Sequence, residues 1–269
     1  MAKRIIKIFF ILLLISGVVA YILFAIINKP NSEKIEICQD IVFDIVDDSN
    51  LTFIDSISIN KALIKAKVYP VGKFMYDVDL EKMEKTLRHN QYIDSVECFK
   101  TFDSKVCVRI KQRIPVIFVI PDSLSDGFFV DSHGNFIPPH TYICNILVAT
   151  GDITRDYAKT HLAEFGNFIM NDKFWNNMIE QVHITKTRGH EPFVELIMRI
   201  GNHTVNLGSI NDFESKLNRL KVFYKKAIPE IGWNRYSRLN LEYGGQIIGT
   251  KYVPPAPIPV AEKTDSVGL

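Results

Sequence analysis

Near its N-terminus this 269-residue chain carries twenty consecutive residues without charge, from Ile8 to Ile27. A helix rises about 1.5 Å per residue, so a run of about 20 residues crosses the hydrocarbon layer of a membrane, which is about 30 Å thick. Three cations precede the run, and basic residues resist translocation. These cations are Lys3, Arg4 and Lys7. We therefore predict a cytoplasmic stub at 1–7, a single transmembrane helix at 8–27, and an exported remainder from about Asn28 onward.

The alternative for this segment is a cleaved signal peptide. Residues 18–20 (Val-Val-Ala) and 23–25 (Leu-Phe-Ala) would provide weak cleavage sites. The apolar core of a signal peptide usually runs for about 7–15 residues, which is shorter than this run, so we favour an uncleaved anchor. No later stretch approaches this length without charge, which predicts one span only.

Composition excludes several classes of protein. With 47% hydrophobic and 23% charged residues, the chain has the make-up of a folded globular protein. Its 32 basic and 30 acidic residues leave a net charge of +2, whereas nucleic-acid-binding proteins carry a clustered basic excess. Four cysteines are too few and too scattered for a disulfide scaffold or a paired-cysteine zinc site.

The cysteines all lie in the exported part, where disulfides can form. They are Cys38, Cys98, Cys107 and Cys144. Cys98 and Cys107 flank a predicted hairpin, but the alternation of apolar residues directs their two sulfurs to opposite faces of the sheet. We therefore expect four reduced and mostly buried cysteines.

Residues 34–115 predict a small α+β domain. A first strand region ends at Val46, two amphipathic helices follow, and Asp79 caps the second helix. The candidates for the N-cap of the first helix are Asp55, Ser56 and Ser58. Two strands between Ile93 and Gln112 close the domain as a hairpin. Both helices would lie on one face of a small sheet, in the order β-α-α-β-β.

Residues 116–252 predict a mostly antiparallel β domain with helices. Residues 131–135, Asp-Ser-His-Gly-Asn, read as a turn between two strands, with Gly134 where a positive φ is needed. The clearest helix runs from Phe213 to Ala227, where apolar residues recur at helical spacing and a proline follows.

The last predicted strand precedes a proline-rich tail. Leu239, Leu241 and Tyr243 alternate with polar residues, and we expect the Gly244-Gly245 pair to bend or bulge a strand that Ile247 and Ile248 continue. Prolines lack the amide donor that extends a sheet, so the tail at 253–269 is expected to be extended or disordered.

The sequence contains no recognisable catalytic or cofactor motif. It lacks a His-Glu-x-x-His helix, a Gly-x-Ser-x-Gly elbow and a phosphate-binding glycine-rich loop. Asp131, Ser132 and His133 are triad residue types, but turn chemistry explains them better. His133 and His140 could form half of a metal site, but solvated histidines in a loop are far commoner. His161 is better explained as a helix-edge residue. We predict no enzyme, no cofactor and no metal.

Four Asp-Ser-x tripeptides resemble the O-glycosylation acceptor pattern of Bacteroidetes. They begin at Asp55, Asp94, Asp122 and Asp265. Such tripeptides also arise by chance, so we base no function on them.

Several local patterns follow one another in a fixed order behind the predicted anchor. They are Tyr-Asp-Val-Asp at 76–79, Tyr-Ile-Asp-Ser-Val at 92–96, a strand ending in Gln-Arg-Ile-Pro-Val at 106–116, Phe-Phe-Val-Asp-Ser-His-Gly at 128–134, and Arg-Leu-Asn-Leu-Glu-Tyr-Gly-Gly at 238–245. Together they resemble the bacterial cell-division protein family FtsQ (DivIB), in a Bacteroidetes-like form. The chain departs from the family at Gln112, where Glu is usual, and at Asn90-Gln91, where Pro-Trp is frequent.

This resemblance implies a POTRA domain at 34–115 and the family's β domain at 116–252. It also implies a non-enzymatic scaffold of the divisome, anchored in the inner membrane, mostly periplasmic and enriched at the division septum. Its partners would be small single-span division proteins, FtsB-like and FtsL-like, that add a strand to an edge near the C-terminus of the β domain. It implies neither a nucleic acid nor a small-molecule substrate.

The matching stretch in this chain is Tyr243 to Lys251, in which glycines would admit a partner backbone and apolar side chains would add contact. The predicted partner-binding residues are Arg235, Tyr236, Arg238, Tyr243, Gly244, Gly245, Gln246, Ile247, Ile248, Gly249, Thr250 and Lys251. The alternative is an ordinary last strand whose isoleucines face the core. Adjacent residues of a strand point to opposite faces, however, so one isoleucine is left for a partner.

Two other functions fit parts of the sequence. An envelope assembly or transport protein with a POTRA module would carry a long C-terminal barrel, for which 137 residues with helices leave no room. A membrane-anchored periplasmic enzyme or sensor is disfavoured by the missing motifs, although a metal held by His133 and His140 would revive it.

Overall fold

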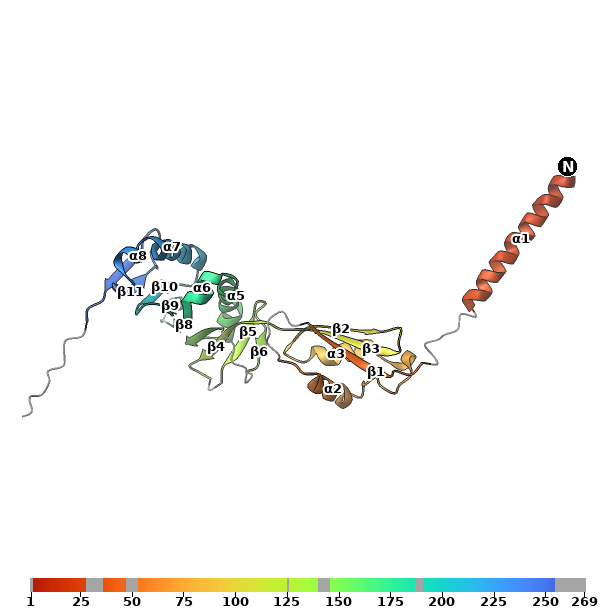
Figure 1. Cartoon of the computed structure of the whole chain (residues 1–269), viewed down its shortest axis with the longest axis horizontal. Coiled ribbons are helices and arrows are strands. Elements are labelled where there is room, and N and C mark those ends of the chain that lie inside the picture. The colour runs from red at the N-terminus through yellow and green to blue at the C-terminus, as the bar shows by residue number, and fades with distance from the viewer. Residues whose placement is uncertain are drawn as a thin grey trace, which may run out of the picture. The chain divides into compact units, whose positions relative to one another are not determined.

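The structure is a computed structural model that describes residues 2–27, 36–46, 53–124, 126–139, 146–186 and 191–254, with the side chains of the first helix from Leu12 onward. Figure 1 shows the order of the elements along the chain. The described residues divide into two compact units. One contains the residues up to Val46 together with 54–111, and the other contains Phe53 and the residues from Gln112 onward.

The first helix, α1 (Ala2–Ile27), contains the whole uncharged run. At about 1.5 Å per residue, a helix of this length extends about 39 Å. Among the side chains that the structure describes, none of the helices combines the length and the apolarity that a membrane span requires.

Besides α1, the first unit contains a three-stranded sheet and two main helices. Its elements are β1 (Asp40–Val46), α2 (Ser56–Lys65), the short 3-10 helix η2 (Met75–Asp77), α3 (Leu80–Arg88), β2 (Ile93–Lys100) and β3 (Lys105–Gln112). The strand order is β1-β3-β2, and β1 runs parallel to β3. The predicted order β-α-α-β-β is therefore confirmed for the described residues.

Both helices of this unit begin at an aspartate that caps them. The carboxylate of Asp55 accepts a hydrogen bond from the N–H of Ser58, and that of Asp79 accepts one from the N–H of Lys82. This selects Asp55 among the three predicted caps of α2. The apolar stripes are almost fully buried against the sheet. Their central residues are Ile59 and Leu63 of α2, and Met83 and Leu87 of α3.

Three of the four cysteines lie in this unit as buried free thiols. They are Cys38, Cys98 and Cys107, whereas Cys144 lies outside the described residues. Burial, together with the nearby Glu84 carboxylate, raises the pKa of the Cys98 thiol to about 12. A thiol with such a pKa stays protonated and unreactive at neutral pH.

The second unit is built on one nine-stranded sheet of order β12-β11-β10-β9-β8-β7-β4-β5-β6. Its strands are β4 (Pro115–Pro121), β5 (Phe128–Asp131), β6 (Phe136–Ile137), β7 (Leu147–Gly151), β8 (Ile179–Thr185), β9 (Phe193–Met198), β10 (Thr204–Gly208), β11 (Tyr236–Asn240) and β12 (Ile248–Lys251). Its helical segments are α4 (Arg155–Tyr157), the π-helical η3 (Ala158–Leu162), α5 (Ala163–Asn171), α6 (Lys173–Met178), α7 (Phe213–Lys226) and α8 (Ile228–Ile231).

Most neighbouring strands in this sheet are antiparallel, as predicted, but three pairs are parallel. The parallel pairs are β4–β7, β7–β8 and β10–β11. Parallel neighbours need a crossover connection, and here helices supply two of them. Segments α4 to α6 connect β7 with β8, and α7 and α8 connect β10 with β11. The α+β class is therefore confirmed, with a mixed rather than purely antiparallel sheet.

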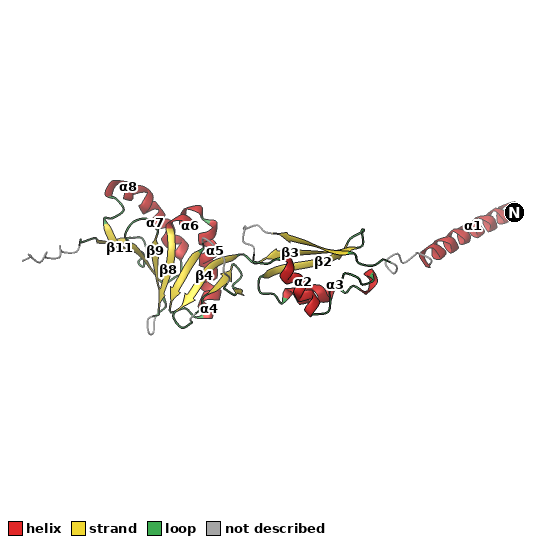
Figure 2. Cartoon of the chain, turned by 60° about the horizontal axis from the view of Figure 1, so that its bottom comes forward, coloured by secondary structure: helices red, strands yellow, loops and turns green. Residues whose placement is uncertain are grey.

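The helices of this unit pack on one face of the sheet (Figure 2). Trp175 and Phe165 lie fully buried at the centre of this layer, together with Leu217 and Leu220 of α7. On β7, β8 and β9 the alternate residues are only partly buried, so the opposite face of the sheet is more accessible.

Candidate partner-binding edge strand

The last two strands form a hairpin at one end of the nine-stranded sheet. β12 pairs antiparallel with β11, and Asn240 lies opposite Ile248. We expected Gly244 and Gly245 to bend a single continuous strand, and this prediction is wrong because the chain reverses direction between the two strands. Gly245 has a φ of +75°, a left-handed conformation that glycine adopts without strain.

The outer side of β12 has no neighbouring strand among the described residues. The direction of its backbone groups follows from the inner strands. The N–H of Leu241 donates to the carbonyl oxygen of Asn206 on β10 at 2.8 Å. Backbone groups alternate along a strand, so the N–H of Asn240 points the other way, toward β12. Ile248, opposite Asn240, therefore directs its own backbone groups inward.

The same alternation identifies the outward-facing groups of β12. The N–H of Tyr252 donates inward to the carbonyl oxygen of Arg235 at 3.1 Å. Tyr252 lies four residues after Ile248, so the backbone groups of both residues point to the same side of the strand. Gly249 and Lys251 consequently present their N–H and C=O groups on the outer edge. An extended partner segment could pair with these groups and become the next strand.

The two isoleucines of the predicted site have different environments. Ile247 is partly buried and packs against the hydrophobic core, whereas 47% of the surface of Ile248 is exposed. Each of the four residues of β12 is exposed. Ile248 is therefore the isoleucine whose side chain is accessible to a partner.

The glycines of the predicted site also differ. A Cβ added at Gly244 or Gly245 would meet no atom within 4 Å, so both lie in open space. Gly249 is covered on one side by the ring of Tyr236, which itself lies 6.2 Å from the ring of Phe223 on α7. On the face of the sheet where the Tyr236 ring lies, that ring fills the space beside Gly249, so a partner side chain could not enter there.

Of the two arginines predicted to flank the site, one contacts another strand of the sheet and the other is exposed to solvent. Arg238 forms an ion pair with Glu195 on β9 at 3.0 Å, and Thr204 donates to the same carboxylate. Arg238 is still half exposed, so this pair contributes little stability by itself. Arg235 is exposed, as are the turn residues Tyr243 and Gln246.

A buried aromatic cluster lies next to the start of β11. Nε2 of His203 lies 2.6 Å from the hydroxyl of Tyr224, and the His203 ring stacks on Trp233 with ring centroids 6.4 Å apart. Burial lowers the pKa of His203 and thus keeps the ring neutral. Trp233 lies three residues before β11, so this cluster fixes where the strand begins.

Sequence reasoning missed two residues of this edge. Tyr252 and Val253 follow β12 directly and expose 48% and 79% of their surfaces. The signal was present, because two apolar residues precede Pro254. The predicted site ends at Lys251, and the predicted tail begins at Val253.

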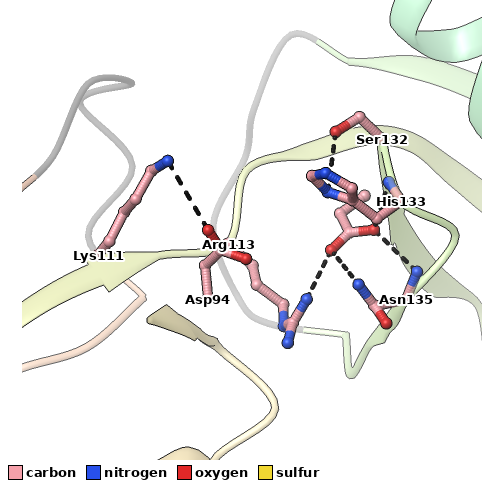
Figure 3. A network of polar contacts seen from close by, with 7 residues as sticks. Asp94, Lys111, Arg113, Ser132, His133 and Asn135 are labelled. Atoms are coloured by element: carbon pink, nitrogen blue, oxygen red, sulfur yellow. Dashed lines mark hydrogen bonds and ion pairs between the residues drawn. The ribbon is translucent and has the colours of Figure 1, made fainter. Parts of the chain in front are cut away.

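The predicted turn at residues 131–135 lies at the opposite end of the sheet, and Figure 3 shows its contacts. The Asp131 carboxylate accepts hydrogen bonds from the N–H groups of His133 and Asn135, from the Asn135 amide and from Arg113 at 2.7 Å. Burial alone would raise the pKa of Asp131, but these hydrogen bonds outweigh it and lower the pKa. Turn chemistry is therefore confirmed for this segment.

The same turn explains its glycine. Gly134 has a φ of +77°, and an added Cβ would fall 2.7 Å from the carbonyl oxygen of Lys159 in η3. The hydroxyl oxygen of Ser132 lies 3.4 Å from Nδ1 of His133, at the long end of hydrogen-bond distances. His140 lies outside the described residues. Within the described ranges no three metal-ligating side chains gather at one point.

Two family models match the chain. A model for the domain described as FtsQ/DivIB, C-terminal related, matches residues 114–250, which is just over half of the chain and includes β4 to β11 and most of β12. A model for a POTRA-like domain matches residues 36–111. None of the curated proteins compared with the chain matches it.

Proposed function

The chain belongs to the FtsQ/DivIB family of divisome proteins, and from this premise we propose that it is a non-enzymatic scaffold for small single-span division proteins. It would hold FtsB-like and FtsL-like partners by adding a strand of the partner to β12. One observation carries this proposal: among the described residues β12 is the terminal strand of the sheet, with outward backbone groups at Gly249 and Lys251. A rigid nine-stranded sheet would present these groups already aligned for pairing.

The side chains around this edge support the same mode of binding. In strand addition the backbone supplies affinity, and alternate side chains supply specificity. Ile248 would give an apolar contact on one face of the extended sheet, and exposed Tyr243 and Tyr252 would contribute at its ends.

The proposal also includes the anchor and the location. The uncharged residues 8–27, within the 26-residue helix α1, would span the inner membrane once, with the basic stub 1–7 in the cytoplasm. The POTRA domain at 34–115 and the β domain at 116–252 would then be periplasmic, and the tail at 253–269 would follow them. Enrichment at the division septum follows from the divisome role.

A backbone-directed substitution tests strand addition most directly. Lys251→Pro removes an outward N–H without removing a β11–β12 hydrogen bond, and edge strands tolerate proline at such positions. Lys251→Ala removes the same side chain and keeps the N–H, so it is the matched control. The full-length parent and both variants would be purified from membranes with their bound proteins, which mass spectrometry then identifies.

We expect the parent and Lys251→Ala to retain short single-span division proteins and Lys251→Pro to lose them. Circular dichroism and thermal melting confirm that each variant is folded. Equal retention by all three would exclude strand addition at β12. Capture of envelope-assembly proteins in place of division proteins, by parent and variants alike, would reject the scaffold function itself.

A further inference from the structure

Four large apolar side chains are exposed at one end of the POTRA-like unit, and we call them the apolar tip. They are Ile37 (49% exposed), Phe74 (43%), Tyr76 (49%) and Phe102 (109%). Soluble surfaces carry scattered apolar residues, but a group of this kind marks a contact surface. Figure 1 shows the β2–β3 hairpin, in whose turn Phe102 lies.

Backbone contacts bring the four side chains to the same end. Ile37 forms a β-bridge with Phe74, whose ring stacks on that of Tyr76 with centroids 5.6 Å apart. Glu36 connects this loop with the hairpin turn. Its carbonyl oxygen accepts from the N–H of Met75 at 2.8 Å, and its carboxylate accepts from the hydroxyl of Ser104 at 3.0 Å.

The tip is also the part of the unit attached to α1. Only residues 28–35 separate the end of that helix from Glu36. At 3.3–3.6 Å per residue, nine chain steps reach at most about 32 Å. If α1 is the anchor, the apolar tip therefore lies within about 32 Å of the end of the membrane span.

Part of the charge at the tip is held in local contacts. Asp103 and Lys105 form an ion pair at 2.7 Å in the hairpin turn, and the Glu36 carboxylate is engaged by Ser104. The tip thus combines its apolar side chains with two exposed charged residues, Lys73 and Asp77, which flank Phe74 and Tyr76 in the chain. Tyrosine concentrates at membrane–water interfaces, because its ring is apolar and its hydroxyl remains in water, and Tyr76 is a residue of this type. Phe74 and Phe102 would add apolar surface beside it.

We propose that the apolar tip inserts shallowly into the outer surface of the lipid bilayer and so holds the POTRA-like unit against the membrane. This contact rests on the proposed anchor, which brings the tip within reach. Its occupant is lipid, and apolar insertion rather than charge drives it. The contact should therefore form on a neutral bilayer and persist at high salt.

Tryptophan fluorescence in brominated lipid tests this contact, because bromine quenches only tryptophans that touch the acyl chains. The full-length chain is reconstituted into phosphatidylcholine vesicles with and without bromine, as the parent and with Phe102→Trp or Ile57→Trp. The two native tryptophans are common to all three proteins, and Trp175 is fully buried.

Ile57 is the matched control within the same unit. It is 63% exposed in the first turn of α2, four residues after Phe53, whose N–H donates to Gln112 at the far end of β3. The eight residues of β3 place Gln112 about 26 Å from the hairpin turn, so α2 begins within a few residues of the opposite end of that strand. Circular dichroism confirms that both variants are folded.

We expect the emission of Phe102→Trp to shift to shorter wavelength and to lose intensity in brominated vesicles, at low and at high salt, while Ile57→Trp behaves as the parent does. Vesicle flotation is measured on the same samples and reports on the anchor alone. Flotation without quenching at position 102 would overturn the tip contact and leave the anchor intact. Quenching that vanishes at high salt would overturn apolar insertion, and loss of flotation would overturn the anchor and the contact together.

Discussion

The ring of Tyr236 lies over Gly249 on the neighbouring strand, so closely that a Cβ added at position 249 would fall 2.5 Å from the ring carbon Cδ1. The two residues lie on adjacent antiparallel strands, and the glycine gives the ring room to pack toward Phe223. The edge strand is thus fixed to the sheet by an aromatic side chain as well as by its backbone pairing.

Gly249→Ala should therefore displace the Tyr236 ring and loosen β12. Overpacking of this kind costs about 1–3 kcal/mol. Urea unfolding would show a lower midpoint, and hydrogen exchange would show faster exchange of the β12 amides. Gly244→Ala is the matched control, since its new methyl group would meet nothing within 4 Å. Equal stability of the two variants would contradict the packing of Tyr236 on Gly249.

The His203–Tyr224 pair predicts a loss of stability in mild acid. Burial lowers the pKa of His203 in the folded protein, whereas an unfolded histidine titrates near its ordinary pKa of about 6.5. Below that pH the unfolded chain binds a proton that the folded chain does not, so the free energy of unfolding falls as the pH drops. The contribution is fully present above about pH 6.5.

Urea unfolding between pH 7.5 and 5.5 measures this effect. We expect His203→Gln to be less stable than the parent at pH 7.5, because its fit to Tyr224 is imperfect, but to lose less stability on acidification. His133→Gln, at an exposed histidine, should follow the parent. Parallel pH curves for the parent and His203→Gln would refute the assignment.

Asp131 makes the opposite end of the sheet sensitive to stronger acid. Its hydrogen bonds with Asn135, Arg113 and His133 overcome the effect of burial and hold its pKa below the ordinary value. The resulting stability is present above the unfolded pKa of about 3.9 and is lost as the pH falls through the folded pKa.

Asp131→Asn removes the charge that Arg113 contacts in a buried setting and should cost about 3 kcal/mol at neutral pH. Calorimetry at pH 7 and at pH 3 would show the difference between parent and variant shrinking in acid. Asp126→Asn, at an exposed aspartate, provides the comparison. A difference that stays constant with pH would mean that the Asp131 charge does not stabilise the turn.

Local signals predicted the first unit well. Asp55 and Asp79 cap their helices because a short acidic side chain reaches the free N–H groups of the first turn, a contact that depends on neighbouring residues alone. The turn around Asp131 was predictable for the same reason. Its partner Arg113 comes from a distant segment, and nothing in the sequence near either residue indicated that pairing.

The hairpin at Gly244 and Gly245 shows where local signals fail. A glycine pair between two apolar runs fits a bulge within one strand as well as a turn between two strands. The choice depends on which strands pair. Leu241 hydrogen-bonds to Asn206 on β10, and the parallel β10–β11 pairing arises from the long crossover through α7. That placement is a tertiary property, as is the covering of Gly249 by Tyr236.

The two adjacent isoleucines of the hairpin should differ in how much their substitution destabilises the fold. Ile247 packs against the core, so Ile247→Glu would place a charge beside apolar side chains and should destabilise the second unit by about 2–4 kcal/mol. Ile248 is about half exposed, so Ile248→Glu should leave the melting temperature nearly unchanged.

Partner binding should show the opposite order of effects, with the larger loss in Ile248→Glu. A charge at Ile248 would enter the apolar contact proposed for a partner strand, so the folded Ile248→Glu protein should lose its division partners in a membrane pull-down. Ile247→Glu should keep partner binding at temperatures where it remains folded, because its side chain packs against the core and not against the proposed partner. If Ile248→Glu kept its partners while remaining folded, the contact would lie on the other face of β12, where Lys251 and the exposed edge of Tyr236 would be the next positions to substitute.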